Sequence, residues 1–500
     1  PPRRQRVEAQ ARMSAYTEFL ASKRIRAAAA GIDAPLALSS KLARFQVDCT
    51  RWALQRGRGA LFQGCGLGKS WQAIEWARVV SAHTDKPVLI LTPLAVASQF
   101  VREGEKLGVR VKHVREPADM FDGARIVVTN YERLDKFEQT IRSLGGVVLD
   151  ESSILKAFDG KTRTKLIEAF AAVAFRLCCT ATPSPNDVAE LGNHAEFLGV
   201  MRRVDMLNRF FEHAGDDTSK WTLKHHGRKP FWRWVASWAI CLNTPSDMGH
   251  SDEGYLLEPL TVHDHVIDVD QKMAHQAGLL FAYEAATLTE QRAVRRASLS
   301  DRVEAVARLV NDSPEQWTVW TDLNDESKQL AKAITGAVEI TGSDPVEHKE
   351  SAMLGFIDGK HRVLVSKSEI CGFGVNLQCA SHTAFVGAGH SFESWHQTVR
   401  RHHRFGQKRP VHVHMFRTSA DGRIVSNLQR KQREHERMVK ELAEVTNEGL
   451  LQMQSPKGTK RVSQNQAHEE RSDASVQELP QQQRPGVVLR KPRRSKAALP

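Results

Sequence analysis

A glycine-rich stretch that ends in lysine and serine carries the clearest chemistry of this 500-residue chain. It reads Gly64-Cys65-Gly66-Leu67-Gly68-Lys69-Ser70. Apolar residues around it predict a buried strand before it and a helix that begins near Lys69. The N–H groups of such a turn and the helix dipole favour phosphate, so Gly64, Gly66 and Gly68 are expected to line a phosphate seat. Lys69 would reach the β- and γ-phosphates and Ser70 would ligate Mg²⁺, although a chance glycine turn is the alternative.

Two adjacent carboxylates, Asp150 and Glu151, follow a short apolar run at 147–149. One carboxylate can hold Mg²⁺ through water, and the next can accept a proton from an attacking water. An acidic turn at a strand end is the common alternative. The Gly-Lys-Ser stretch upstream favours the catalytic interpretation.

The elements that must position these groups are strands alternating with helices. Continuous apolar runs at 88–91, 126–129, 147–149 and 177–179 predict strands buried on both faces. Alternation with helices predicts a parallel sheet, and ligands of such sheets bind at the carboxyl ends of the strands. The glycine-rich stretch, Thr92, Thr129 and the carboxylate pair are therefore expected to share one edge.

The same alternation returns after residue 300, with predicted strands at 317–320 and 363–366. A later helix carries Gln397, Arg401 and Arg404 at i, i+4 and i+7, which places them on one face. Two guanidiniums one turn apart can close on a γ-phosphate held by another domain. An ordinary basic helix is the alternative for an arginine-rich segment.

These segments together resemble superfamily II helicases, and within them the Swi–Snf type of DNA translocase. The segments that resemble its first-half motifs, in order, are GLGKSWQAIEWA, LILTPLAVASQF, VVTNYERL, VVLDESSILK and CCTATPSPNDVAEL. The second half contributes SKSEICGFGVNLQCASHTAFVG and an Arg-x-His-Arg-x-Gly-Gln pattern at 401–407. Two departures stand out. Gln63-Gly64 replaces the usual Asp-Glu pair, and Ser152-Ser153 replaces a histidine that links the ATP state to the next motif.

The resemblance implies an α/β fold of two tandem RecA-like parallel-sheet domains around a cleft for ATP and Mg²⁺. It implies an ATP-dependent DNA translocase, in which Lys69, Ser70, Asp150 and Glu151 face Gln397, Arg401 and Arg404. The implied contacts with nucleic acid come from Thr92, Pro93, Thr129, Thr180, Thr182, and the segment from Ser366 to Asn376. Gln46 precedes the glycine-rich stretch, and its amide could read the adenine edge, with an exposed helix residue as the alternative.

The chain divides by composition into six expected segments. They are a helical lead-in (1–40), the first RecA-like domain (41–200), a helical insertion (201–299), the second RecA-like domain (300–416), a charged helix (417–454) and a disordered basic tail (455–500). The insertion holds Trp221, Trp232, Trp234 and Trp238 among basic residues. These rings could stack on bases, but burial against the motor is favoured because tryptophan is mostly buried.

A formal net charge of +13 favours a polyanionic partner, nucleic acid before membrane, and the resemblance favours duplex DNA. No apolar run approaches the roughly 18 residues that span a bilayer, and no secretory signal is visible. The seven cysteines lack ligand-like spacing, which predicts a reducing, cytoplasmic compartment. His402, His403, His412 and His414 lack a third ligand, so no zinc site is expected.

Two rival functions remain open at this level. A strand-separating DNA or RNA helicase shares the same motor motifs, because a separating wedge has no sequence signature. A catalytically inactive nucleic-acid-binding scaffold is the rival from another class, and the intact Lys69, Glu151, Arg401 and Arg404 argue against it. A restriction-type role would need a partner subunit, and a protein partner in replication, repair or restriction stays open.

Overall fold

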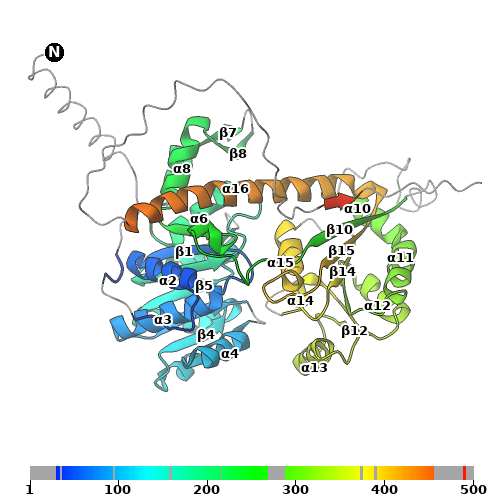
Figure 1. The fold of residues 1–500 in the computed structure, drawn as a ribbon, viewed down its shortest axis with the longest axis horizontal. Helices are drawn as coiled ribbons and strands as arrows, with labels where there is room; N and C mark the ends of the chain where they lie inside the picture. The colour runs from blue at the N-terminus through cyan, green and yellow to red at the C-terminus, as the bar shows by residue number, and fades with distance from the viewer. Residues whose placement is uncertain are drawn as a thin grey trace, which may run out of the picture.

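The protein is seen in a computed structural model, which describes residues 30–33, 37–93, 96–156, 160–214, 217–268, 288–371, 376–387, 391–454 and 488–490. Its helices and strands form two sheet domains that lie side by side, with one long helix across both (Figure 1). Most of the predicted lead-in at 1–40 lies outside the described residues.

The first domain is built on a parallel seven-stranded sheet in the order β3-β4-β2-β5-β6-β1-β9. The strands are β1 (Arg58–Gln63), β2 (Val88–Thr92), β3 (Val111–His113), β4 (Ile126–Asn130), β5 (Gly146–Asp150), β6 (Phe175–Thr180) and β9 (Ala239–Leu242). Helices α2 (Arg44–Arg56), α3 (Lys69–Thr84) and α4 (Ala97–Leu107) cover one face. Helices α5 (Lys161–Ala169), α6 (Leu191–Phe197), α7 (Arg203–Phe210) and α8 (Arg228–Val235) cover the other. Successive strand residues enter opposite cores, which explains their unbroken apolar runs.

The second domain repeats this plan with the strand order β12-β13-β11-β14-β15-β10-β16. The strands are β10 (Leu260–Ile267), β11 (Trp317–Thr321), β12 (Ala337–Ile340), β13 (Val363–Ser366), β14 (His382–Val386), β15 (Val411–Thr418) and β16 (Val488–Arg490). The helices are α10 (Leu288–Ala297), α11 (Leu299–Asn311), α12 (Asn324–Ala333), α13 (Val346–Ile357), α14 (Ser368–Cys371) and α15 (Phe392–His402). Helices α11 and α12 pack on one face of the sheet, and α13 and α15 on the other. The predicted α/β class with two parallel-sheet domains is confirmed.

The predicted helical insertion at 201–299 needs a correction. It holds α7, α8 and the hairpin of β7 (Phe211–Ala214) and β8 (Asp217–Leu223), but it also supplies β9 to the first sheet and β10 to the second. β9 has only four residues, and so short an apolar run cannot be distinguished from a buried helix by periodicity. Trp232, Trp234 and Trp238 are buried in the core of the first domain, as favoured from the sequence.

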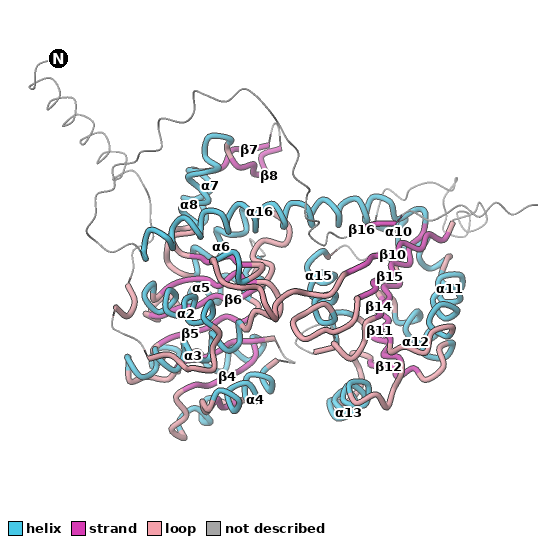
Figure 2. Tube along the Cα trace, in the orientation of Figure 1, coloured by secondary structure: helices cyan, strands magenta, loops and turns pink. Residues whose placement is uncertain are grey.

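The long helix α16 (Gly422–Gln454) lies where the charged helix was expected, and it touches both domains (Figures 1 and 2). Near its start, Leu428 packs with Phe392 of α15. Further along, Met438 and Leu442 are buried in the core of the first domain. Arg228 donates two hydrogen bonds to the Glu441 carboxylate, at 2.8 and 2.7 Å. The helix is therefore a strap between the domains.

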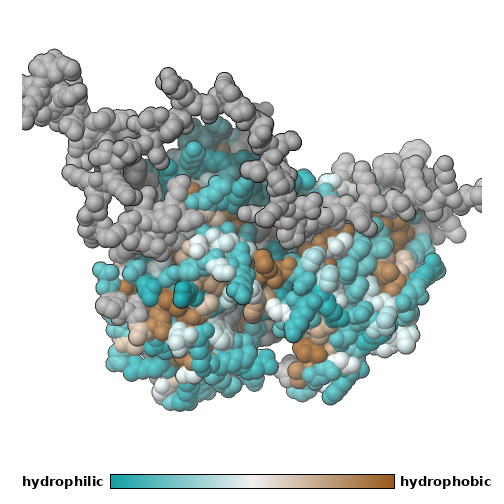
Figure 3. Space-filling view, viewed as in Figure 1, coloured by the Kyte–Doolittle hydropathy of each residue, from teal (hydrophilic) through white to brown (hydrophobic). Residues whose placement is uncertain are grey.

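The predicted disordered tail at 455–500 lies outside the described residues, except for β16, which pairs in parallel with β10. The face shown in Figure 3 is mostly hydrophilic over both domains, with small hydrophobic patches. None of the helices in the described part of the chain is long and apolar enough to cross a membrane.

Candidate nucleotide-binding and catalytic site

The glycine-rich loop connects β1 to α3, and the helix begins at Lys69 as predicted. Gly66 and Gly68 have φ angles of +91° and +78°, which side-chain-bearing residues rarely adopt. The Lys69 ammonium donates to the carbonyls of Gln63 and Gly64, at 2.9 and 3.2 Å. The Lys69 ammonium thus lies inside the turn, where it can contact a bound phosphate.

Two glutamines support this loop. The Gln46 amide accepts a hydrogen bond from the backbone N–H of Ala43 at 2.9 Å and donates to the carbonyl of Leu67 at 3.0 Å. Gln63 and Gln72 exchange two side-chain hydrogen bonds in the core, at 2.9 and 2.8 Å. Gln63 therefore braces the loop against α3 at the position where the family usually has a carboxylate. The contact of Gln46 with adenine stays a prediction.

The predicted shared edge of the first sheet is confirmed by the strand register. Asp150 lies opposite Cys179, Phe62 opposite Thr180, and Thr92 opposite Asn130. The Thr92 hydroxyl donates to Asp150 Oδ2 at 3.1 Å. Five strand ends thus meet beside the glycine-rich loop.

The carboxylate pair is under electrostatic strain. Burial, followed by repulsion from Glu151, raises the pKa of Asp150 to about 7, against the stabilising charge of Lys69. Glu151 has a φ of +52°, which a residue with a side chain adopts only when its surroundings enforce it. Its Oε2 atom is buried and has no hydrogen-bond partner. Such an orphaned acceptor is costly, and it points to a missing donor.

The second domain places α15 across from this edge. Arg401 Nη2 lies 3.9 Å from Glu151 Oε1, and Gln397 Nε2 donates to the Thr182 hydroxyl at 3.5 Å. Burial, followed by repulsion from Arg401, lowers the pKa of Arg404. The structure therefore brings the predicted residues Gln397 and Arg401 of the second half close to Thr182 and Glu151 of the first half.

Most of the residues that were predicted to contact nucleic acid are buried in the protein. Five of these hydroxyl-bearing residues are fully buried, namely Thr92, Thr129, Thr180, Thr182 and Ser366. Thr129 donates to the carbonyl of Val114 at 2.7 Å and Ser366 to that of Ile340 at 2.8 Å. Pro93 and Asn376 retain solvent-accessible surface. The contacts of the five hydroxyls with nucleic acid stay a prediction, since here the hydroxyls bond within the protein.

The sequence reasoning missed a buried histidine beside the carboxylates. His194 of α6 lies 3.1 Å from the hydroxyl of Ser152, through its Nε2 atom. Burial lowers the pKa of His194 to about 4, so the ring is neutral. Ser152 and Ser153 stand where the family usually has a histidine. In this protein the ring of His194, which belongs to α6, lies beside that position. No signal in the sequence connects two residues 42 positions apart.

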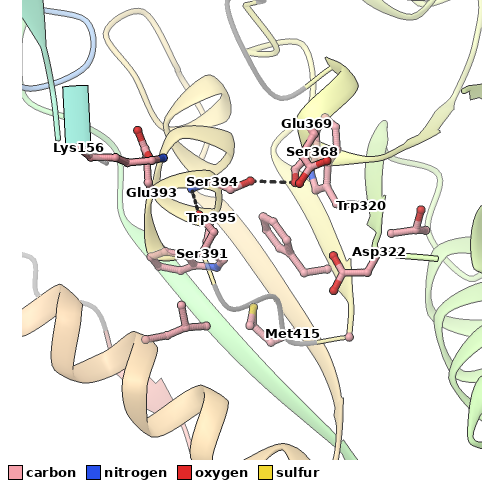
Figure 4. A pocket seen from close by; sticks show the side chains of 14 residues that line it. Lys156, Trp320, Asp322, Ser368, Glu369, Ser391, Glu393, Ser394, Trp395 and Met415 are labelled. Atoms are coloured by element: carbon pink, nitrogen blue, oxygen red, sulfur yellow. Dashed lines mark hydrogen bonds and ion pairs between the residues drawn. The ribbon is translucent and has the colours of Figure 1, made fainter. Parts of the chain in front are cut away.

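A cavity of about 380 Å³ lies at the carboxyl ends of β11, β13 and β14 (Figure 4). It is separate from the nucleotide cleft, because Lys69, Glu151 and Arg401 do not line it. Lys156 of the first domain pairs with Glu393 of α15 at its rim, and Ser368 and Ser394 bond at 2.9 Å. Asp322 and Glu369 also line the cavity, and this acidic lining disfavours a phosphate backbone.

Comparison with known proteins agrees with the two-domain site. Residues 45–218 match the model of the SNF2-related domain, and residues 301–406 match the helicase conserved C-terminal domain. The fold and the cleft define a nucleic-acid-dependent ATPase of superfamily II. The chain belongs to the Swi–Snf type, because it carries both domains of an ATP-driven DNA motor of that type.

Among solved structures, one similar chain is the Sulfolobus solfataricus SWI2/SNF2 ATPase core in complex with dsDNA. It is 16% identical, with a TM-score of 0.39, and the match covers 77% of this chain and 89% of that chain. No curated protein matches the chain.

Proposed function

We propose that the protein couples ATP hydrolysis to translocation along duplex DNA. The observation that carries the proposal is the buried, unpartnered Oε2 of Glu151, which lies in a cleft that Arg401 enters from the other domain. The carboxylate of Glu151 has a free acceptor atom and faces the guanidinium of Arg401. A carboxylate placed in this way can accept a proton from the water that attacks a γ-phosphate.

The residues present fit Mg²⁺-ATP. Lys69 is held by two carbonyls that a phosphate oxygen can replace as its partners. Ser70 follows it on the first turn of α3, and Asp150 lies at the neighbouring strand end. Bound Mg²⁺ would neutralise phosphate charge, with Ser70 and Asp150 as its protein ligands. A nearby cation would also favour the ionised form of Asp150, which burial disfavours.

The roles of the protein groups follow from their positions. Glu151 accepts the proton of the attacking water, and Lys69, Arg401 and Arg404 stabilise the charge that develops on the γ-phosphate. Gln397 and Thr182 connect the two domains beside the carboxylates, so a change at the γ-phosphate alters this contact. Movement of α15 against the first sheet would then step the two domains along DNA.

The partner is proposed to be duplex DNA. A net charge of +13 supports a polyanion, and accessible surface is offered by Pro93, directly after β2, and by Asn376, in the segment between α14 and β14. A protein partner in replication, repair or restriction would fit the same motor. We place the protein in a cytoplasmic, reducing compartment on the basis of its cysteines.

The test is steady-state ATP hydrolysis without nucleic acid and with single-stranded DNA, duplex DNA and RNA. Strong stimulation by duplex DNA that Glu151→Gln abolishes is expected. A triplex-displacement assay run beside a strand-separation assay then distinguishes the two motors, and displacement without separation is expected. Stimulation only by single strands would favour a helicase, and no hydrolysis under any condition would favour a scaffold.

A further inference from the structure

Glu151 lies at a strained point of the backbone, directly after β5 and directly before a short 3-10 helix, η4 (Ser152–Lys156). Its φ of +52° is one of two positive φ angles that residues other than glycine adopt in the described part of the chain. A residue with a side chain keeps such a conformation only where the contacts around it enforce it. The contacts on the two sides of Glu151 therefore decide where its carboxylate points.

On the strand side, the contact comes from Tyr131, the residue that follows β4. Its hydroxyl donates a hydrogen bond to the carbonyl of Asp150 at 2.7 Å, in the interior of the domain. Burial, followed by the negative charge of Asp150, raises the pKa of Tyr131 well above its usual value, so the hydroxyl remains a donor. This bond fixes the peptide group that joins Asp150 to Glu151.

On the other side, helix α6 holds η4 at both of its ends. His194 Nε2 lies 3.1 Å from the hydroxyl of Ser152, the first residue of η4. The Asn193 side-chain amide donates to the carbonyls of Leu155 and Lys156, the last two residues of η4, at 2.8 and 3.2 Å. Asn193, His194 and Ser152 are fully buried, so these bonds are shielded from bulk water, which strengthens them.

The imidazole of His194 also contacts the strand that leads into the glycine-rich loop. Its ring meets Phe62 of β1 edge to face, with centroids 5.2 Å apart and planes 81° apart. Phe62 precedes Gln63, whose carbonyl accepts a hydrogen bond from Lys69. His194 therefore lies between the segment that holds the lysine and the segment that carries Glu151.

Packing alone does not explain the polar groups around η4. Apolar side chains would fill the same space, because a buried polar group lowers stability unless it is hydrogen-bonded. A phenol, an amide and an imidazole from two separate segments instead direct hydrogen bonds at one short stretch of backbone. Hydrogen bonds fix direction as well as distance, and direction is what a strained residue needs from its surroundings.

We propose that Tyr131, Asn193 and His194 are positioning residues that hold the backbone of Glu151, so that its buried Oε2 faces the attacking water. This inference rests on the proposed function. The three residues act through Glu151 and not on the nucleotide. Loss of any one of their bonds lets the φ of Glu151 relax toward the ordinary negative range, and the carboxylate then points elsewhere.

The test measures single-turnover ATP hydrolysis and equilibrium ATP binding for Tyr131→Phe, Asn193→Leu and His194→Phe. Each rate constant of hydrolysis should fall by about 10- to 100-fold, while the affinity for ATP stays within about twofold of normal, because a displaced catalytic group affects the reaction and not the binding. His194→Gln should recover most of the rate, since its amide can reach the hydroxyl of Ser152. Glu196→Gln is the matched control on α6, because Glu196 pairs with Arg163 of α5.

The same substitutions in a Glu151→Gln background separate positioning from a general structural role. Residues that act only through Glu151 should lower the remaining rate by less than about twofold, because the group they position is already lost. A second loss as large as the first would overturn the inference.

Hydrogen exchange of the peptide 151–156 gives a readout that needs no turnover. Exchange there should be faster in Tyr131→Phe, Asn193→Leu and His194→Phe, while exchange in β2 should be unchanged. An unaltered protein that hydrolyses no ATP would contradict the proposed function, and faster exchange in the variants would still confirm that these residues hold the backbone of Glu151. Unchanged exchange at 151–156, an unchanged rate in all three variants, or a loss of ATP affinity as large as the loss of rate would overturn the inference.

Discussion

The two sheets have the same number of strands and the same parallel direction, yet they deliver charge to the cleft in different ways. The first sheet supplies its groups from strand ends and their loops, namely Lys69, Asp150 and Glu151. The second supplies Arg401 from helix α15 and Arg404 from the turn after it, while its own strand-end residue Ser366 is fully buried. Two sheets of similar topology can therefore contribute different catalytic groups, because the chemistry depends on the side chains and not on the fold.

The interiors of the sheets differ as well. In the second sheet, histidines on β10, β14 and β15 stack on one another. His263 and His414 lie 4.5 Å apart with planes 12° apart, and His382 and His412 lie 4.8 Å apart with planes 18° apart. The strands at the same positions in the first sheet, β5, β6 and β1, carry no histidine. The ring nitrogens of His263 and His412 lie 3.1 Å apart, and those of His265 and His414 lie 3.0 Å apart, so hydrogen bonds also connect the rings.

The largest expected effect on ATP hydrolysis comes from replacing Arg401 of α15. Arg401→Ala should lower the DNA-stimulated kcat by about 10³- to 10⁵-fold, because the variant loses the guanidinium that faces Glu151. Arg401→Lys should recover only part of the rate, since lysine lacks the planar fork. Phosphate release at saturating ATP measures both, with Arg400→Ala as the control on the same helix. A kcat within threefold of normal for Arg401→Ala would contradict the assignment.

Replacing Glu151, the general base of the first domain, should have the next largest effect on kcat. Glu151→Gln should lower kcat by about 10²- to 10⁴-fold while ATP binding persists, because the amide cannot accept the proton of water. Single-turnover hydrolysis and equilibrium ATP binding are the measurements. Glu132→Gln, an exposed carboxylate after β4, should behave like the unaltered protein. Loss of ATP binding in Glu151→Gln would make the residue structural.

Acidification should destabilise the second domain before the first. In the second domain, burial lowers the pKa of His382, His402 and His403 to about 4 and that of His414 to about 2. In the first domain, burial lowers the pKa of His194 to about 4 and also lowers that of His113. In the unfolded chain these groups titrate near 6.5, so the unfolded state binds more protons as the pH falls from 6.5 toward 4. Stability is therefore complete above pH 6.5 and declines by about 1.4 kcal/mol per pH unit for each fully shifted histidine.

Hydrogen exchange at pH 7.5 and 5.5, corrected for the intrinsic rate, resolves the two domains. The strands β14 and β15 should lose more protection than β2 and β5. Equal losses in both sheets would show that the stacked histidines do not set the acid stability.

The strap α16 can be loosened from the first domain alone. Glu441→Ala removes the partner of Arg228 and of the Trp232 indole N–H, which should cost about 1–3 kcal/mol. The thermal midpoint of the first domain should fall, while that of the second should change less. Glu444→Ala, an exposed carboxylate one turn of the helix away, is the matched control. An equal fall for both variants would assign the effect to the helix and not to the contact.

The smallest effect should arise from the contact between the cleft halves. Thr182→Val removes the hydroxyl that accepts from Gln397, and the ratio of DNA-stimulated to basal hydrolysis should fall by about two- to tenfold. Thr164→Val, on α5 of the first domain, is a control away from the cleft. An unchanged ratio would mean that the contact between Gln397 and Thr182 does not couple the two domains.

Much of the fold follows from local patterns. Continuous apolar runs located β2, β4, β5 and β6, and the glycines at 66 and 68 located the loop, because these features depend on near neighbours in the chain. The spacing of Gln397, Arg401 and Arg404 predicted one helix face, and this was wrong for Arg404. Helix α15 ends at His402, so Arg404 lies in the turn that follows the helix. The strands β9, β10 and β16 were missed, since only pairing with distant strands distinguishes them from other short segments.

The sequence by itself determined the residue types of the nucleotide site, their order, and the parallel sheets that collect them at one edge. Only the tertiary structure decided that Glu151 has a buried oxygen without a partner, that His194 lies beside Ser152, and that Phe405 stacks on Tyr255. The reason is physical. Burial and partnership depend on contacts between residues far apart in the chain, and these exist only once the two domains and the strap have packed together.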